Sequence, residues 1–133
     1  MRSNGIVIHT DGACKGNPGP GGWGAVIEQN GGQVKLSGSE PQTTNNRMEM
    51  TAVIKGLEAV DASANVLISS DSTYVINTMT KGWKRKANQD LWDQLDRLGE
   101  SRNVSWRWVR GHNGDRGNEL ADGLATKEAG TAK

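Results

Sequence analysis

The sequence has no phenylalanine and contains one tyrosine and one cysteine among its 133 residues. A single cysteine, Cys14, cannot form an internal disulfide and has no second thiolate with which to build a cysteine-based zinc site. Disulfide-stapled secreted folds are therefore excluded, and a reducing, cytoplasmic location is predicted.

Long apolar runs and a large net charge are absent as well. No segment approaches the ~20 apolar residues of a membrane-spanning helix, and the N-terminus lacks a signal-peptide pattern, so no membrane partner is expected. With 16 Lys and Arg against 15 Asp and Glu, the net charge is +1, and any basic footprint for nucleic acid must be local. The best candidate is the cluster Lys81, Lys84, Arg85 and Lys86, for which a merely solvated surface is the alternative.

The remaining composition is that of a soluble globular protein, with 34% hydrophobic and 23% charged residues. The length predicts a single domain over residues 1–133, with a core from about residue 5 to 129 and a disordered C-terminal tail. Nothing in the sequence indicates more than a monomer.

Apolar spacing and turn residues predict nine elements. Strands are expected at 5–10, 23–29, 33–38, 65–70 and 104–108, and helices from Thr44, from Thr73, at 90–98 and after Gly117. The glycine- and proline-rich stretch 12–22 is interpreted as a loop, and Asn30-Gly31 predicts a hairpin turn. The order predicts an α/β fold with a mixed sheet, antiparallel in its first strands and parallel where helices connect the later ones.

The five tryptophans divide into two groups. Trp92, Trp106 and Trp108 are predicted to lie in the core, whereas Trp83, beside Lys84 in the basic cluster, is a candidate for contact with a nucleic-acid backbone or sugar.

Carboxylates carry the clearest chemical signal. Asp11 and Asp71 each follow a buried strand, where α/β sheets place reactive groups, although an Asp at such a position can also cap a turn. Glu49 in one helix and Asp122 in another could reach the same edge, giving four oxygen ligands suited to Mg²⁺ or Mn²⁺. Clustered acids without a nucleophile triad favour two-metal phosphoryl chemistry.

Two further features of the sequence bear on function. His112, in the glycine-rich segment 111–114, is a candidate proton shuttle or simply a solvated side chain, and His9 is interpreted as structural. The dinucleotide-like spacing at 19–24 is discounted because a strand follows it, leaving no helix N-terminus for a pyrophosphate.

Several motifs occur together in a characteristic order. They are Thr10-Asp11-Gly12-Ala13-Cys14, Gly16-Asn17-Pro18-Gly19, Thr44-Asn45-Asn46-Arg47-Met48-Glu49, Ser70-Asp71-Ser72, and Gly111-His112 with Ala121-Asp122. From Ile6 to about Ala129 the sequence resembles bacterial type 1 ribonuclease H, a family with a five-stranded mixed sheet flanked by helices.

The resemblance implies a function and a set of catalytic residues. The expected activity is hydrolysis of the RNA strand of an RNA–DNA hybrid by two Mg²⁺ or Mn²⁺ ions, leaving 5′-phosphate and 3′-hydroxyl ends. By position, Asp11, Glu49, Asp71 and Asp122 would be the metal-binding catalytic acids, and His112 would assist proton transfer or product release. Glu119 would have at most a peripheral role.

The resemblance also implies substrate contacts. Cys14, Asn17, Asn45 and Asn46 match residues that meet the minor groove of the hybrid, although Asn17 before Pro18 also suits a turn. Thr44 and Asn88 match a pocket for a phosphate of the DNA strand, and Trp83 and Lys84 would add contacts from the basic cluster.

Two departures from the family pattern affect substrate binding. The segment between Tyr74 and Trp92 is shorter than a full basic protrusion, which predicts weaker, salt-sensitive hybrid binding. Thr73 stands where many relatives have a glutamine that touches the substrate. Two rival functions stay open, a DNA-cutting resolvase or integrase core and a non-catalytic nucleic-acid-binding module.

Overall fold

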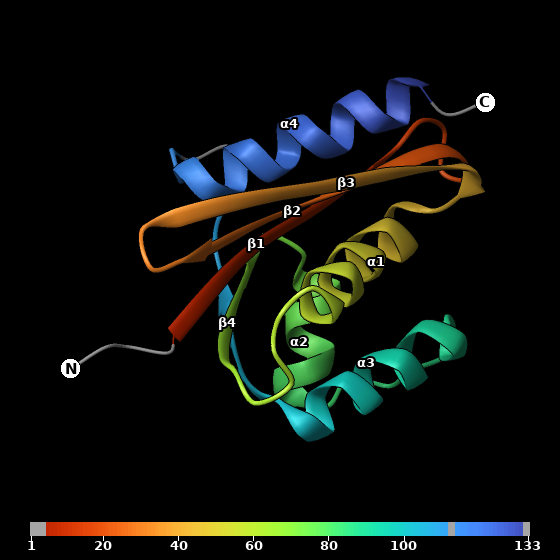
Figure 1. Cartoon of the computed structure of the whole chain (residues 1–133). Helices are drawn as coiled ribbons and strands as arrows, with labels where there is room; N and C mark the ends of the chain where they lie inside the picture. The colour runs from red at the N-terminus through yellow and green to blue at the C-terminus, as the bar shows by residue number, and fades with distance from the viewer. Residues whose placement is uncertain (1–4, 112–113, 132–133) are drawn as a thin grey trace.

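The computed structural model describes residues 5–111 and 114–131, so His112 lies outside the described residues. The described residues form five strands and four helices (Figure 1). The strands are β1 (Gly5–Cys14), β2 (Gly19–Gln29), β3 (Gly32–Thr43), β4 (Asn65–Ser70) and β5 (Asn103–Trp108). The helices are α1 (Asn45–Glu58), α2 (Thr73–Lys81), α3 (Gln89–Ser101) and α4 (Arg116–Thr131). Their order along the chain is β1-β2-β3-α1-β4-α2-α3-β5-α4.

All five strands form one mixed sheet in the order β3-β2-β1-β4-β5. β1, β2 and β3 pair antiparallel, while β1 with β4 and β4 with β5 pair parallel, which confirms the predicted fold class. The hairpin between β2 and β3 turns at Asn30 and Gly31, whose φ angles of 55° and 80° are the positive values that this tight turn requires.

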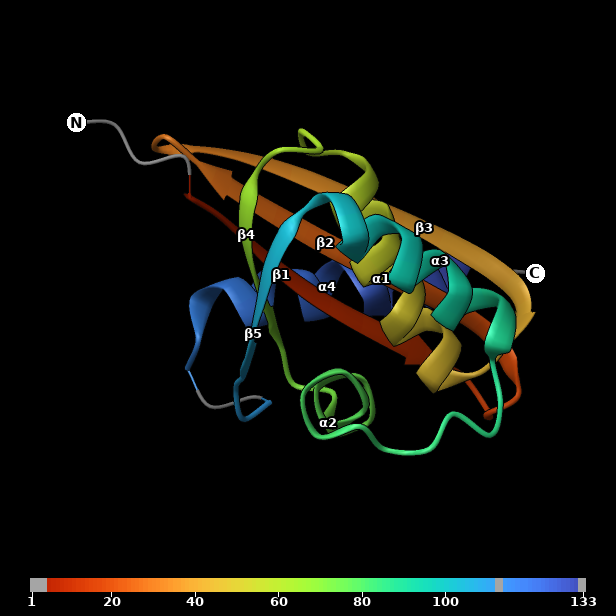
Figure 2. The ribbon, with the colours of Figure 1, turned by 90° about the horizontal axis from the view of Figure 1, so that it is seen from below.

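Helices cover both faces of the sheet (Figures 1 and 2). α1, α2 and α3 lie on one face, where Ile8 and Ile68 of the sheet are fully buried with Ile54 of α1 and Trp92 of α3. α4 lies on the other face, across β2, β1 and β3. No helix among the described residues is long and apolar enough to cross a membrane.

α4 approaches β2 so closely that the strand needs glycine there. A Cβ atom on Gly22 would lie 2.4 Å from the carbonyl oxygen of Ala125, and one on Gly24 would lie 2.6 Å from that of Ala121. Because real Cβ atoms do not come so near to a backbone, only glycine lets the helix lie directly on the strand. Gly22 and Gly24 therefore serve the packing of α4 on β2.

Several predicted boundaries were wrong. β1 runs on to Cys14 and β2 begins at Gly19, so most of the stretch interpreted as a loop is paired strand. β3 continues to Thr43, α3 passes through Gly99 to Ser101, and α4 extends to Thr131. In each case strand pairing or helical hydrogen bonding continues past residues that usually end a strand or a helix.

Trp108 is not a core residue, contrary to the prediction. Its side chain is 47% exposed, whereas Trp92 is fully buried and Trp106 packs against the core. The alternation in β5 was interpreted correctly, but β5 is the edge strand and Trp108 is its last residue.

Candidate metal centre

Two neighbouring strands bring Asp11 and Asp71 to the same edge of the sheet. The last parallel pair between β1 and β4 is Thr10 with Ser70, and each acid is the next residue of its chain segment. Asp71 follows β4 as predicted, but Asp11 lies inside β1, where it pairs with Gly24 of β2. The predicted adjacency is therefore correct, although only Asp71 ends a strand.

Glu49 reaches this edge because α1 begins against β1. The hydroxyl of Thr44 accepts a hydrogen bond of 3.2 Å from the backbone N–H of Arg47 and so caps the helix. A Cβ atom on Gly12 would lie 2.4 Å from the backbone nitrogen of Glu49, so this glycine permits the contact between strand and helix. Glu49 is thereby held beside the residue that follows Asp11.

The three acids form a compact group. Asp11, Glu49 and Asp71 each offer a carboxylate oxygen, and these oxygens all lie within 4.8 Å of one another. One oxygen of Asp11 accepts a hydrogen bond of 2.9 Å from the N–H of Gly12. Oε1 of Glu49 is buried and has no hydrogen-bond partner among the described residues. A buried carboxylate oxygen without a donor is suited to a cation.

Asp122 comes to this group from the opposite side of the sheet, on α4. It is half-buried and interacts with Asp11, but it lies outside the compact trio. The close contact of α4 with Gly24, the pairing partner of Asp11 in β2, accounts for this placement.

Burial and mutual repulsion disfavour ionisation of these acids. Burial, followed by the charge of Asp71 and interaction with Asp122, raises the pKa of Asp11 to about 8. Burial and then the charges of Asp11 and Asp71 raise the pKa of Glu49 well above its usual range. The ion pairs of residues 5–111 and 114–131 include no Lys or Arg bound to the trio. Hard oxygen ligands in such a group suit a divalent ion such as Mg²⁺ or Mn²⁺.

The residues expected at the minor groove gather around the start of α1. The side-chain oxygen of Asn17 accepts a hydrogen bond of 2.7 Å from the N–H of Asn45. The thiol of Cys14 donates to the carbonyl oxygens of Gly19 and Thr43, at 3.5 and 3.4 Å. Asn46 is exposed in the first turn of the helix. Four side chains from two segments are thus brought together on the surface.

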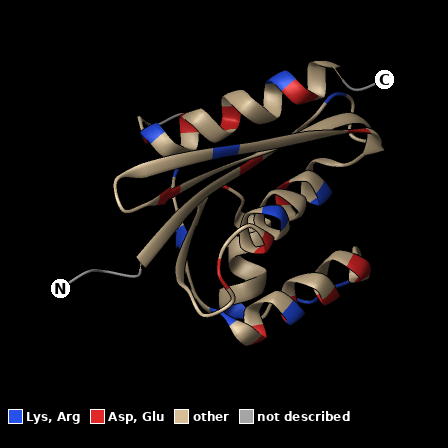
Figure 3. Ribbon diagram, in the orientation of Figure 1, with Lys and Arg blue, Asp and Glu red and all other residues tan. Residues whose placement is uncertain are grey.

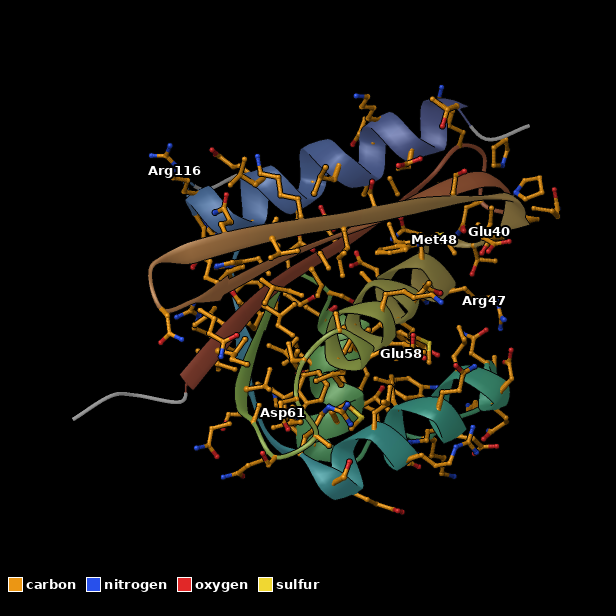
Figure 4. All side chains as sticks on the ribbon, viewed as in Figure 1. Glu40, Arg47, Met48, Glu58, Asp61 and Arg116 are labelled. Atoms are coloured by element: carbon orange, nitrogen blue, oxygen red, sulfur yellow. The ribbon has the colours of Figure 1, made fainter. Side chains whose placement is uncertain are left out.

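Thr44 and Asn88, expected at a phosphate pocket, both contact Arg47. Asn88 accepts a hydrogen bond of 3.2 Å from Nη1 of Arg47 and donates one of 3.1 Å to the hydroxyl of Tyr74. The guanidinium of Arg47 also donates two hydrogen bonds, of 3.0 and 2.7 Å, to the carboxylate of Asp90. Its side chain extends from α1 toward α3 (Figure 4). Sequence reasoning missed Arg47, because its partners lie about 40 positions further along the chain.

The basic cluster begins at Lys81, the last residue of α2, and continues in the segment between α2 and α3. Trp83 is 48% exposed and Lys84 is exposed, as a substrate-contacting role would require. Arg85, in contrast, pairs with Asp96 at 2.6 Å and stacks over the ring of Trp92, 5.1 Å from its centroid. Positively and negatively charged residues are intermixed along α3 and α4 (Figure 3). No ion pair of the described residues involves Lys81, Lys84 or Lys86, so these three lysines carry the unpaired charge of the cluster.

His9 has a structural environment, as predicted. Its ring is buried in β1, with Nε2 3.1 Å from Oε1 of Glu28 and Nδ1 3.9 Å from Oδ1 of Asp115. It therefore connects β1 to β2 and to the residue before α4.

Comparison with known proteins finds similarity to ribonuclease H over almost the whole chain. The RNase H family model matches residues 3–130. A ribonuclease H of Maricaulis maris is 50% identical over 142 residues, covering 96% of this chain and 95% of its own. The N-terminal RNase H domain of a Mycobacterium tuberculosis protein superimposes with a TM-score of 0.84 at 29% identity, covering 95% and 94% of the two chains.

A third similar protein was solved with a nucleic acid. LC11-RNase H1 in complex with an RNA/DNA hybrid has a TM-score of 0.80 and 27% identity, covering 94% of this chain and 96% of its own.

Proposed function

Because the chain belongs to the ribonuclease H family, we propose that it hydrolyses the RNA strand of RNA–DNA hybrids with divalent metal ions held by its clustered acids. The observation that carries this proposal is the group of Asp11, Glu49 and Asp71, whose oxygens lie within 4.8 Å of one another without a protein cation paired to them in the described residues. LC11-RNase H1, solved with a hybrid, supplies the substrate class.

Four carboxylates would hold two Mg²⁺ or Mn²⁺ ions, with Asp122 as the fourth ligand group. Bound there, the ions supply Lewis acidity and an activated water for phosphoryl transfer. Asp11 and Glu49, whose pKa values are raised, would have to be ionised to hold these ions, because ligand carboxylates are deprotonated. Cleavage on this pattern leaves a 5′-phosphate and a 3′-hydroxyl.

His112 would carry a proton to or from the reacting groups, since an imidazole can exchange protons near neutral pH. Its position lies outside the described residues, and its role rests on the match of Gly111-His112 to the family motif.

The hybrid would lie over the start of α1. Cys14, Asn17, Asn45 and Asn46 would face its minor groove, where an amide can both donate to and accept from a 2′-hydroxyl. Thr44 and Asn88 would meet a phosphate of the DNA strand, and Trp83 and Lys84 would extend the contact surface. A cytoplasmic location, a monomeric state and a single domain stay predictions from the sequence.

Cleavage of a labelled RNA–DNA hybrid tests the proposal. The same RNA as a single strand and as an RNA duplex, and a DNA duplex, serve as alternative substrates, each with Mg²⁺ and with EDTA. We expect metal-dependent cutting of the hybrid alone, and extension of the RNA fragments by a polymerase would report their 3′-hydroxyl ends.

Asp11→Asn should reduce cleavage about a thousandfold or more, since metal-assisted stabilisation is worth several kcal/mol. Asp93→Asn makes the same chemical change on the exposed side of α3 and should leave cleavage unchanged. Absence of cutting by the wild-type protein with either Mg²⁺ or Mn²⁺ would favour a binding module. Cutting of duplex DNA would favour the resolvase-like alternative.

A further inference from the structure

Trp108 is a half-exposed tryptophan beside the acid group. It is the last residue of β5, and its side chain is 47% exposed. Its indole Nε1–H donates a hydrogen bond of 3.2 Å to the backbone carbonyl oxygen of Asp71. Because an indole nitrogen only donates, this contact satisfies a peptide oxygen at the edge where the acids meet.

Asp71 depends on such contacts more than the other two acids of the trio. Asp11 lies within paired strands and Glu49 within a helix, so regular backbone hydrogen bonds fix both residues. Asp71 lies in neither, because β4 ends at Ser70 and α2 begins at Thr73. The position of Asp71 therefore depends on contacts with segments other than β4 and α2.

The end of β5 supplies those neighbours. The N–H of Val109 donates to the carbonyl oxygen of Ser70 at 3.0 Å, and Trp108 binds the next carbonyl. Gly111 lies against the carboxylate itself, since a Cβ atom there would be 2.7 Å from Oδ2 of Asp71. The segment from Trp108 to Gly111 thus contacts Asp71 at its backbone and at its side chain.

We propose that Trp108 is a positioning residue, whose indole N–H fixes the Asp71 peptide so that the carboxylate faces Asp11 and Glu49. This inference rests on the proposed function, because it assumes that the trio binds metal. Groups that orient a metal ligand affect metal affinity strongly, although they never touch the ion. A phenylalanine would cover the same surface but could not hold the peptide.

Trp108→Phe tests this role, with Trp106→Phe as the matched control on the same face of β5. Thermal midpoints measured against Mn²⁺ concentration, without substrate, give the metal affinity. We expect Trp108→Phe to bind Mn²⁺ about tenfold more weakly and to need about tenfold more metal for half-maximal hybrid cleavage. The hybrid KM at saturating metal and the metal-free midpoint should stay near wild type. Trp106→Phe should retain the wild-type metal affinity.

Gly111→Ala provides a second variant, because the added methyl group must displace Oδ2 of Asp71. It should also weaken Mn²⁺ binding measured without substrate.

The outcomes separate the two proposals. A wild-type protein that cuts hybrids and is stabilised by Mn²⁺, together with a Trp108→Phe variant of equal metal affinity, would overturn the positioning role alone. A variant altered only in hybrid KM would show that the indole contacts the substrate instead, which also overturns positioning. A wild-type protein that neither cuts hybrids nor binds Mn²⁺ would contradict both the proposed function and the positioning role.

Discussion

Arg47 and Glu49 lie two positions apart on α1, and they belong to opposite kinds of charged site. Arg47 grips the exposed carboxylate of Asp90 with two hydrogen bonds and lowers the pKa of that acid to about 2. Glu49 is buried with Asp11 and Asp71, and burial and like charge raise the pKa of Asp11 to about 8. One site is neutralised by the protein and the other is left without a cation in the described residues.

The cationic side chain of Arg47 starts only two positions from Glu49 in the sequence, yet it binds Asp90 and not the trio. Residues at i and i+2 point in different directions on a helix, so the Arg47 side chain reaches α3 while Glu49 faces the sheet edge. Asp90 is exposed and paired with a cation, whereas the trio is buried and has no Lys or Arg partner among the described residues. This contrast is what the proposed metal site requires, because burying an uncompensated charge is costly.

The largest expected effect concerns the metal-free protein. Because the pKa of Asp11 is raised to about 8 in the folded state, the folded protein keeps a proton that the unfolded chain releases above about pH 4. The resulting stabilisation is complete below that pH and is lost as pH rises through about 8. Metal-free wild type should therefore unfold more easily at about pH 9 than at about pH 5.

Asp11→Asn should reduce this pH dependence, and the part that remains should come from Glu49, whose pKa is also raised by burial. At about pH 9 the metal-free variant should be more stable than wild type by on the order of a few kcal/mol, at about 1.4 kcal/mol per pKa unit. Denaturant unfolding at both pH values in EDTA measures this, with Asp93→Asn as the exposed control. A wild-type protein equally stable at both values would refute the contrast between the sites.

Arg47→Ala breaks the neutralised site and should have a smaller effect. It removes the ion pair with Asp90 and the hydrogen bond to Asn88, so we expect a thermal midpoint lower by a few degrees. Because the pKa of Asp90 is about 2, this loss should be the same from about pH 5 to pH 9. Arg97→Ala, an exposed arginine on α3, is the control. A loss that varies across this range would contradict the assignment.

The smallest expected effects distinguish an unpaired cation of the basic cluster, Lys84, from a paired one, Arg85. Lys84→Ala removes an exposed cation and should reduce the slope of log affinity against log salt by about 1 for hybrid binding. Arg85→Ala removes a side chain committed to Asp96 and Trp92, so it should lower the thermal midpoint and leave the slope unchanged. Binding titrations at several salt concentrations decide this. Equal slopes for Lys84→Ala and wild type would exclude Lys84 as a phosphate contact.

Local signals predicted most of the fold. Asn30-Gly31 specified the hairpin, the apolar spacing of α1 specified a helix, and the connections specified which strands run parallel. The glycine-rich stretch 12–22 was wrongly interpreted as a loop. A strand on which a helix backbone packs directly is as rich in glycine as a loop is. That contact depends on α4, about 100 positions away.

The site was predictable to a similar extent. Asp11 and Asp71 followed from buried strands, and the motifs supplied Glu49 and Asp122. The contacts around the acids and around the start of α1 were not predictable. Trp108 bonds to a residue 37 positions earlier, and no local pattern encodes such a pair.

The contact of α4 with Gly22 and Gly24 of β2 makes the position of Asp122 depend on the stability of the whole fold. Asp122 is carried by a helix whose backbone lies on Gly22 and Gly24, without side chains between that could rearrange. Separating Asp122 from Asp11 therefore requires the whole helix to leave the sheet, which is a cooperative opening and not a local fluctuation. Amide protons in the middle of α4 should consequently exchange with solvent as slowly as those of β1, so that Asp122 separates from Asp11 only when α4 leaves the sheet.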